Sequence, residues 1–260
     1  MKKNHKNKFY LYTLLLVFVI QFSIAQYPEV REKIINLPNF DNKALHYGYF
    51  LGTNQYDFKF EYVDTYYEEM IYKDITVNQK NGFNVGLIGD LKINKFLNLR
   101  FEPGLYYNQR ELVYPEYIEF TRESDRLREI KSTYIHLPLY LKINAKRINN
   151  FRPFLLFGAS TDFNLSSNES NSDDNASNVF RTTTKSFNYE LGIGFEFYLY
   201  YFKFSPSLRG IFSLQNELIQ DNSKESPWTK NIINMFSRGL SLIITFDSPN
   251  NSINVLKKEW

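Results

Sequence analysis

The sequence contains no cysteine, three histidines, and a single apolar run long enough to suggest a targeting or spanning segment. Without cysteine there is no disulfide and no acylated cysteine, so we expect neither a disulfide scaffold nor a lipid-anchored form. Because His46 and His136 are far apart and no glycine-rich phosphate loop is present, we also expect no metal ion, cofactor or small-molecule substrate.

The one long apolar run, residues 11–24, follows four lysines and ends at the small-residue site Ser23-Ile24-Ala25. This pattern predicts a secretory signal peptide over residues 1–25. Four of the 31 basic residues fall in that segment and no acidic ones do, which leaves 27 basic and 28 acidic residues in the rest of the chain. A nearly neutral exported protein is not expected to bind nucleic acid.

Eight later stretches alternate apolar and polar residues with period two, which indicates β-strands. The clearest runs from Phe187 to Leu199, with apolar side chains at every odd position. The predicted strands cover residues 45–58, 82–94, 97–110, 131–145, 152–165, 186–199, 201–215 and 234–247. Each is long enough to cross a bilayer, for which a tilted strand needs roughly 9 to 11 residues.

The connectors between these strands alternate between long and short. Residues 59–81, 111–130, 166–185 and 216–233 form long loops, whereas 95–96, 146–151 and 200 form short turns. This predicts an all-β fold, an eight-stranded antiparallel transmembrane β-barrel with up-and-down connections over residues 45–247, integral to the cell outer membrane. We expect extracellular long loops, a periplasmic segment 26–44 and a periplasmic tail 248–260.

Alternation alone does not say which face is outside, because a soluble ligand-binding barrel alternates with its apolar face inward. The interior of an eight-stranded barrel is only just filled by side chains, so the many large apolar residues on one face must point to lipid. Nine of the eleven glycines lie on the other face, where space is tight. We therefore expect outer-membrane lipid around the barrel and a polar lumen.

The polar face carries charges of both signs, so we expect a lumen filled by paired charges rather than an open pore. The structural network that this predicts consists of Arg100, Glu102, His136, Glu190, Glu196 and Arg209. Other polar residues on that face are Asn84, Asp90, Lys92, Arg110, Lys142, Asp162 and Lys203.

Three prolines, Pro103, Pro138 and Pro206, lie in the middle of predicted strands. Each removes a donor from the hydrogen-bond ladder, and a closed barrel has no edge strand to hold it. We expect bulges or local bends at these positions.

Two features leave alternatives open. Tyr62, Tyr66 and Tyr67 in the first long loop either contact a partner or cover the barrel mouth, or they form an ordinary interfacial aromatic cluster or a simple extension of the strand. Ser132 and His136, with Glu190 or Glu196, would suit a lipid-modifying hydrolase, but no nucleophile motif accompanies them. A small passive channel, suggested by the many charges of the lumen, is the other alternative function.

Several segments resemble the PorT/SprT family of outer-membrane barrel proteins. They are residues 41–60 (DNKALHYGYFLGTNQYDFKF), 82–91 (GFNVGLIGDL), 131–139 (KSTYIHLPL), 147–153 (RINNFRP) and 201–210 (YFKFSPSLRG). The resemblance implies a component of the type IX secretion system, which exports folded cargo and, in gliding bacteria, delivers surface adhesins. It implies a non-enzymatic accessory or assembly subunit whose partners are other subunits of the outer-membrane translocon.

Overall fold

The computed structural model describes residues 34–64, 74–116, 120 and 122–248. The chain divides into the units Met1–Ile35 and Asn36–Trp260, and all described strands belong to the second. The predicted signal peptide, residues 26–33, Tyr66, Tyr67 and the tail from residue 249 lie outside the described residues.

Antiparallel strands account for nearly all of the regular structure. They are β1 (Leu45–Tyr62), β2 (Thr76–Lys92), β3 (Leu97–Phe101), β4 (Gly104–Val113), β5 (Leu127–Asn144), β6 (Phe151–Asn164), β7 (Lys185–Tyr198), β8 (Lys203–Ser213) and β9 (Ile232–Asp247). Three short 3-10 turns complete the set, namely η1 (Phe40–Asn42), η2 (Glu123–Arg126) and η3 (Asn175–Ser177). Among the described residues, no helix is long and apolar enough to cross a membrane.

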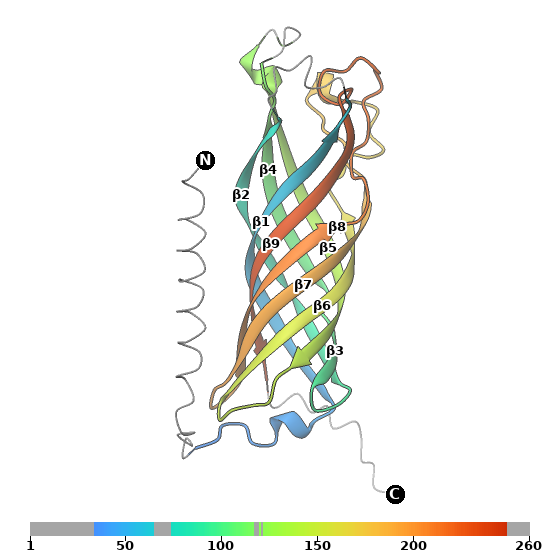
Figure 1. Ribbon diagram of the computed structural model, residues 1–260. Coiled ribbons are helices and arrows are strands. Elements are labelled where there is room, and N and C mark those ends of the chain that lie inside the picture. The colour runs from blue at the N-terminus through green and yellow to red at the C-terminus, as the bar shows by residue number, and fades with distance from the viewer. Residues whose placement is uncertain (1–33, 65–73, 117–119, 121, 249–260) are drawn as a thin grey trace, which may run out of the picture. The chain divides into compact units, whose positions relative to one another are not determined.

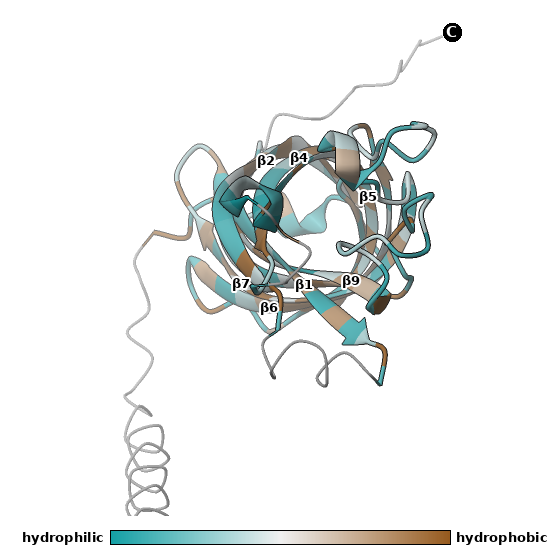
Figure 2. Cartoon of the chain, turned by 90° about the horizontal axis from the view of Figure 1, so that it is seen from above, coloured by the Kyte–Doolittle hydropathy of each residue, from teal (hydrophilic) through white to brown (hydrophobic). Residues whose placement is uncertain are grey.

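The strands close into a ring, seen end-on in Figure 2. Strand β1 pairs with β2 on one side and with β9 on the other. Strands β3 and β4 both lie between β2 and β5. Together they occupy one strand position of the ring, and we call each such position a stave. The ring therefore has eight staves, which confirms the predicted up-and-down barrel.

The interruption between β3 and β4 falls at Glu102 and Pro103, opposite Pro138 on β5. Pairing is also missing between β7 and β8 beside Pro206. At both gaps the register is the same on either side. The prolines therefore remove hydrogen bonds from the ladder, but neither strand contains the extra residue that would make a bulge. The described register shifts lie instead in β2 between Lys80 and Phe83 and at the end of β1. Of the two expected forms, bulges or local bends, the bulges are wrong: the pairing is interrupted locally without a change of register.

Several strands extend further than predicted toward the long loops, and β1, β2 and β5 do so by the most residues. Strand β1 continues to residue 62 rather than 58, β2 begins at 76 rather than 82, and β5 begins at 127 rather than 131. In these extensions the outward positions carry Lys59, Lys80 and Glu129, which are exposed. Because charged residues replace apolar ones at these outward positions, the alternation that reveals a strand in the sequence is weakened there.

The two faces of the barrel wall differ sharply in chemistry. Leu87 and Leu139 on the outer face are 65% and 50% exposed, whereas Arg100 and Glu190 on the inner face are 0% and 1% exposed. Large apolar side chains cover the outside of every stave. A surface of this kind is compatible with lipid rather than water.

Inward glycines make room for the rings that fill the lumen. A Cβ atom at Gly86 or Gly104 would lie 2.5 or 2.6 Å from the Phe50 ring. At Gly158 it would lie 2.5 Å from Tyr140. These positions therefore require glycine for packing, and all of their φ values are negative.

The barrel has two different ends. We call the end with connectors 63–75, 114–126, 165–184 and 214–231 the long-loop end, which is at the top of Figure 1. The short-turn end has connectors 93–96, 145–150 and 199–202, and the segment 36–44 that leads into β1 lies across it.

Candidate functional site

An ion pair spans the barrel between opposite staves. Arg209 on β8 donates two hydrogen bonds to the carboxylate of Glu102, which lies between β3 and β4. Three staves separate these positions in either direction around the ring. The Glu102 carboxylate also lies 2.6 Å from Nε of Arg100, and all three side chains are fully buried. This layer ties the two sides of the wall together.

A second layer, nearer the short-turn end, is centred on Glu196 of β7. Its carboxylate accepts hydrogen bonds from Lys142, from Lys203 at 2.8 Å and from Arg152 at 2.5 Å. Lys142 also lies 3.3 Å from Asp90 of β2. Each amine and guanidinium is thus held by carboxylates from staves one or two positions away in the ring, which compensates the cost of burying its charge.

The third layer contains His136 of β5. Its Nδ1 lies 2.5 Å from Asp162 and its Nε2 lies 3.2 Å from Glu190. Tyr140 donates its hydroxyl to Glu190, and the Tyr106 ring lies 4.2 Å from the His136 ring. Both imidazole nitrogens therefore face carboxylates.

Ser132 belongs to a different layer. Its hydroxyl oxygen accepts a hydrogen bond from Arg110 at 3.2 Å, and Arg110 also donates to Tyr134 and to Ser237. Four residues of strand, about 13 Å, separate Ser132 from His136. The structure does not bring these two side chains together as a nucleophile and base.

The six residues of the predicted lumen network are all buried inside the barrel. Arg100, Glu102 and Arg209 form one cluster, His136 and Glu190 a second, and Glu196 belongs to a third. Within the described part of the chain, no group of three or more histidines or acids is arranged to hold a metal ion.

Sequence reasoning did not single out three further members of these clusters. Arg152 and Asp247 continue the inward parity of their strands, so the alternation could have identified them. Asp247 belongs to the Glu196 cluster because its carboxylate lies 3.0 Å from Lys203. Asp41 precedes the first strand, where no periodicity marks it.

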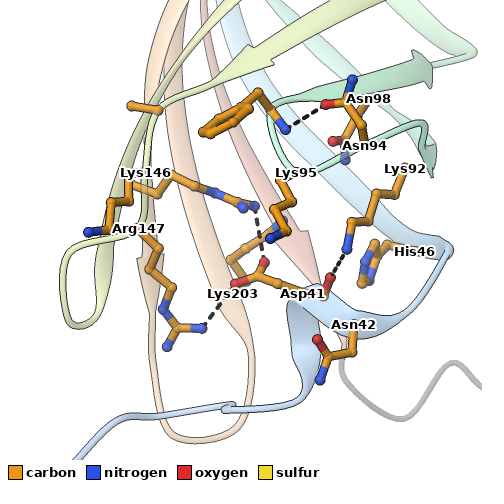
Figure 3. A pocket seen from close by; sticks show the side chains of 13 residues that line it. Asp41, Asn42, His46, Lys92, Asn94, Lys95, Asn98, Lys146, Arg147 and Lys203 are labelled. Atoms are coloured by element: carbon orange, nitrogen blue, oxygen red, sulfur yellow. Dashed lines mark hydrogen bonds and ion pairs between the residues drawn. The ribbon is translucent and has the colours of Figure 1, made fainter.

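Asp41 lies in the segment that crosses the short-turn end (Figure 3). Its carboxylate accepts a hydrogen bond from Arg147 at 3.2 Å and one from the Tyr198 hydroxyl at 2.8 Å, and it lies 3.2 Å from Arg152. The adjacent Phe40 is buried and stacks on His46 with ring centroids 4.4 Å apart. The segment therefore covers this end of the lumen.

The long-loop end is closed by an apolar cluster instead. Its buried members are Phe58, Ile75, Leu112, Tyr114, Ile130, Phe180, Leu218, Ile232 and Met235. Tyr62, the described member of the predicted aromatic loop, packs against this cluster and accepts a hydrogen bond from the Ile75 amide at 3.1 Å. Trp228 donates to the carbonyl of Asp125, which joins two of the long loops.

Glu217 is a buried carboxylic acid next to this cluster, since it precedes Leu218 in the chain. It accepts a hydrogen bond from Ser237 at 2.7 Å, and its amide donates to the carbonyl of Met235. Burial raises the pKa of Glu217 above its ordinary value, because the charged form loses its hydration.

Comparison with solved structures finds several proteins of low sequence identity. The chain is similar to Neisserial surface protein A, with 10% identity, a TM-score of 0.38, and 78% of this chain and 96% of that chain covered. It is similar to OprG of Pseudomonas aeruginosa, with 12% identity, a TM-score of 0.41 and coverages of 78% and 93%. For Ail of Yersinia pestis the values are 12%, 0.35, 79% and 99%.

Among curated proteins no match is found. A family model described as an outer membrane protein beta-barrel domain matches residues 25–218. This match covers most of the chain, including seven of the eight staves. The protein is an integral outer-membrane protein, and it belongs to the outer membrane β-barrel domain family.

Proposed function

We propose that this barrel is a non-enzymatic accessory or assembly subunit of the type IX secretion system. The observation that carries the proposal is the Arg209–Glu102 ion pair, which joins opposite staves inside the lumen. A lumen crossed in this way has no passage for a folded protein. The barrel would therefore serve export through contacts of its outer surfaces and not as the conduit.

The segments that resemble the PorT/SprT family support this role. Residues 82–91, 131–139 and 201–210 supply Asp90, His136 and Arg209 to the lumen. Residues 41–60 and 147–153 meet at the short-turn end, where Asp41 binds Arg147 and Arg152. The resemblance thus falls on the parts that close the barrel, and this supports a shared structural role.

In this proposal the long loops face the cell exterior and both termini face the periplasm, as in other barrels with an even number of strands. Because the chain lacks cysteine, single cysteines can report the orientation. Ser172→Cys in a long loop should react with a membrane-impermeant maleimide on intact cells. Lys146→Cys in a short turn should react only after the outer membrane is permeabilised; the reverse pattern would contradict the orientation.

The assignment as a non-enzyme is supported by the surroundings of His136 and Ser132. Both nitrogens of His136 face carboxylates, and Ser132 is bound to Arg110. A lipid-modifying enzyme would require a free base beside the nucleophile. His136→Ala should leave the lipid profile of the cell unchanged, and a changed profile would favour the enzyme.

The central test is a deletion strain complemented by the wild-type gene or by loop variants. We expect deletion to abolish secretion of type IX cargo and the wild-type gene to restore it. Affinity purification of the tagged barrel from membranes should recover other translocon subunits. Normal cargo export in the deletion strain, with recovery of the barrel alone, would refute the proposal.

A passive channel is tested separately by planar-bilayer recording. We expect no steady conductance, because the buried charges of the lumen are paired with one another rather than with a water column. Stable open-channel currents from the purified barrel would contradict this expectation.

A further inference from the structure

A cavity of about 380 Å³ opens at the short-turn end of the barrel (Figure 3). It lies between the segment 41–42, the β2–β3 turn and the β5–β6 turn, and reaches the first inward side chains of the lumen. The residues that line it are Asp41, Asn42, His46, Lys92, Asn94, Lys95, Phe96, Asn98, Ala145, Lys146, Arg147, Arg152 and Lys203.

Positive charge dominates this cavity. Six lysines and arginines line it against one acid, Asp41. The two arginines share the carboxylate of Asp41, and Lys203 is held by Glu196 and Asp247 behind the cavity wall. These contacts account for three of the six cations.

The other three cations are lysines without a carboxylate partner among the described residues. Lys92 reaches only a backbone carbonyl, that of Asp41, at 2.5 Å. Lys95 and Lys146 are exposed, and they make no ion pair with any residue of the described ranges. Three like charges around one cavity repel one another, and an anion placed between them would remove that repulsion.

The lining also offers neutral donors. The side-chain oxygen of Asn94 accepts hydrogen bonds from the amides of Phe96 and Leu97, at 2.7 and 2.9 Å. This fixes the orientation of the Asn94 amide, whose NH₂ group has no partner within the described part of the chain. Ammonium groups and an oriented amide are suitable ligands for phosphate oxygens.

The same two turns carry exposed apolar side chains, of which Phe96 also lines the cavity. Ile93, Phe96 and Ile148 are 58%, 55% and 52% exposed, and they alternate along the chain with the cavity lysines. In an outer-membrane barrel, exposed apolar residues at the end of the wall mark the boundary between acyl chains and headgroups. The cavity therefore opens beside the headgroup layer.

We propose that this cavity binds the phosphate of an anionic membrane lipid. Lys92, Lys95 and Lys146 would hold the phosphate, the Asn94 amide would donate to it, and the acyl chains would lie against Phe96 and Ile148. A lysine at a membrane boundary can also extend its ammonium group into water without binding any ligand. Binding of a lipid in the cavity is distinguished from this by its selectivity for the charge of the headgroup and by its dependence on the cavity residues.

The test titrates the purified barrel in detergent with dihexanoyl-phosphatidylglycerol, dihexanoyl-phosphatidylcholine or inorganic phosphate, by calorimetry. We expect phosphatidylglycerol to bind more tightly than phosphatidylcholine. In Lys95→Gln/Lys146→Gln this preference should fall by about fivefold for each lysine. Because both lysines are exposed, the double variant should fold, and its heat-modifiable gel mobility checks this.

Two matched variants sharpen the test. Lys95→Arg/Lys146→Arg retains the charge and should retain the preference. Lys80→Gln/Lys131→Gln removes two lysines from the opposite end of β2 and β5, where both contact Glu129, and should also retain it.

Equal binding of the two lipids by the wild type, or an unchanged preference in the Lys95→Gln/Lys146→Gln variant, would overturn the proposal. Inorganic phosphate that binds as tightly as phosphatidylglycerol would overturn the lipid assignment and leave a site for free phosphate. The outcome is independent of the secretion role, since lipid binding is measured on the isolated barrel.

Discussion

The two ends of the barrel are closed by different physical forces. At the short-turn end, the carboxylate of Asp41 binds Arg147 and Arg152, and the charged layers of Glu196 and Glu102 lie immediately above. At the long-loop end, Met235 and Leu112 belong to an apolar cluster that fills the barrel mouth. One end is held by directional ionic contacts and the other by apolar burial.

This difference teaches how a barrel without a conventional core obtains a fixed interior. Membrane lipid is as apolar as the outer wall, so burial of the wall against lipid does not organise the inside. Each buried charge pairs with a particular partner on another stave, so few other arrangements of the strands would keep all the charges paired. A buried charge that loses its partner is strongly unfavourable. Beyond the apolar band, the loops meet water, and there ordinary hydrophobic burial can organise them.

The largest effect should come from breaking the ionic layer at its centre. Glu102→Gln leaves Arg209 and Arg100 buried without their shared carboxylate. We expect a loss of about 3 to 5 kcal/mol in the free energy of unfolding, because two guanidinium charges are left uncompensated. Urea unfolding of the barrel in lipid vesicles measures it.

Glu129→Gln is the matched control for that variant. Glu129 is exposed and pairs with Lys131 and Lys80 at the long-loop end, so its removal should cost less than about 1 kcal/mol. Equal losses in the two glutamine variants would show that the lumen pairs contribute no more than surface pairs.

The apolar end should respond next most strongly, and locally. Met235→Ala removes a fully buried side chain from the cluster and should cost about 2 to 4 kcal/mol. We expect faster proteolysis of the long loops, at a rate independent of salt. Ile233→Ala, at an exposed neighbouring position, is the control. An effect that spread to the short-turn end would break the distinction between the two closures.

The alternation of residues was sufficient to predict the wall but not the contacts inside it. Period two identified the staves and placed Arg100, Glu190 and Arg209 on the inward face. That Arg209 meets Glu102 across the lumen depends on the stagger of eight strands, which no single strand encodes. The segment at Phe40 and Asp41 has no periodicity. That it covers the short-turn end becomes clear only once the β-barrel brings Arg147, Arg152 and Tyr198 into contact with Asp41.

The cover at the short-turn end should show a smaller and salt-sensitive effect. Asp41→Asn removes the charge that binds Arg147 and Arg152, at a site that is partly exposed, so we expect a cost of about 1 kcal/mol. Hydrogen exchange of residues 36–44 should accelerate, and high salt should bring the wild type toward the variant.

Glu116→Gln at the long-loop end serves as its control, since Glu116 forms an exposed ion pair with Arg126 and the loss of this pair should leave exchange of residues 36–44 unchanged. If high salt left the wild-type segment as protected as before, Phe40 rather than the ionic contacts would be the main anchor of the cover.

The smallest effect should be a pH dependence confined to the apolar end. Burial raises the pKa of Glu217 above its ordinary value near 4.5, so the protonated form is favoured in the folded state. The stabilisation that Glu217 contributes is fully present below about pH 4.5 and is lost as the pH rises through the raised pKa.

Hydrogen exchange of residues 214–231, corrected for intrinsic rates, should therefore show weaker protection at neutral pH than in acid. Glu217→Gln should abolish this slope, whereas Glu225→Gln, at an exposed position in the same loop, should preserve it. A slope that survived in Glu217→Gln would mean that a different group couples the apolar closure to pH.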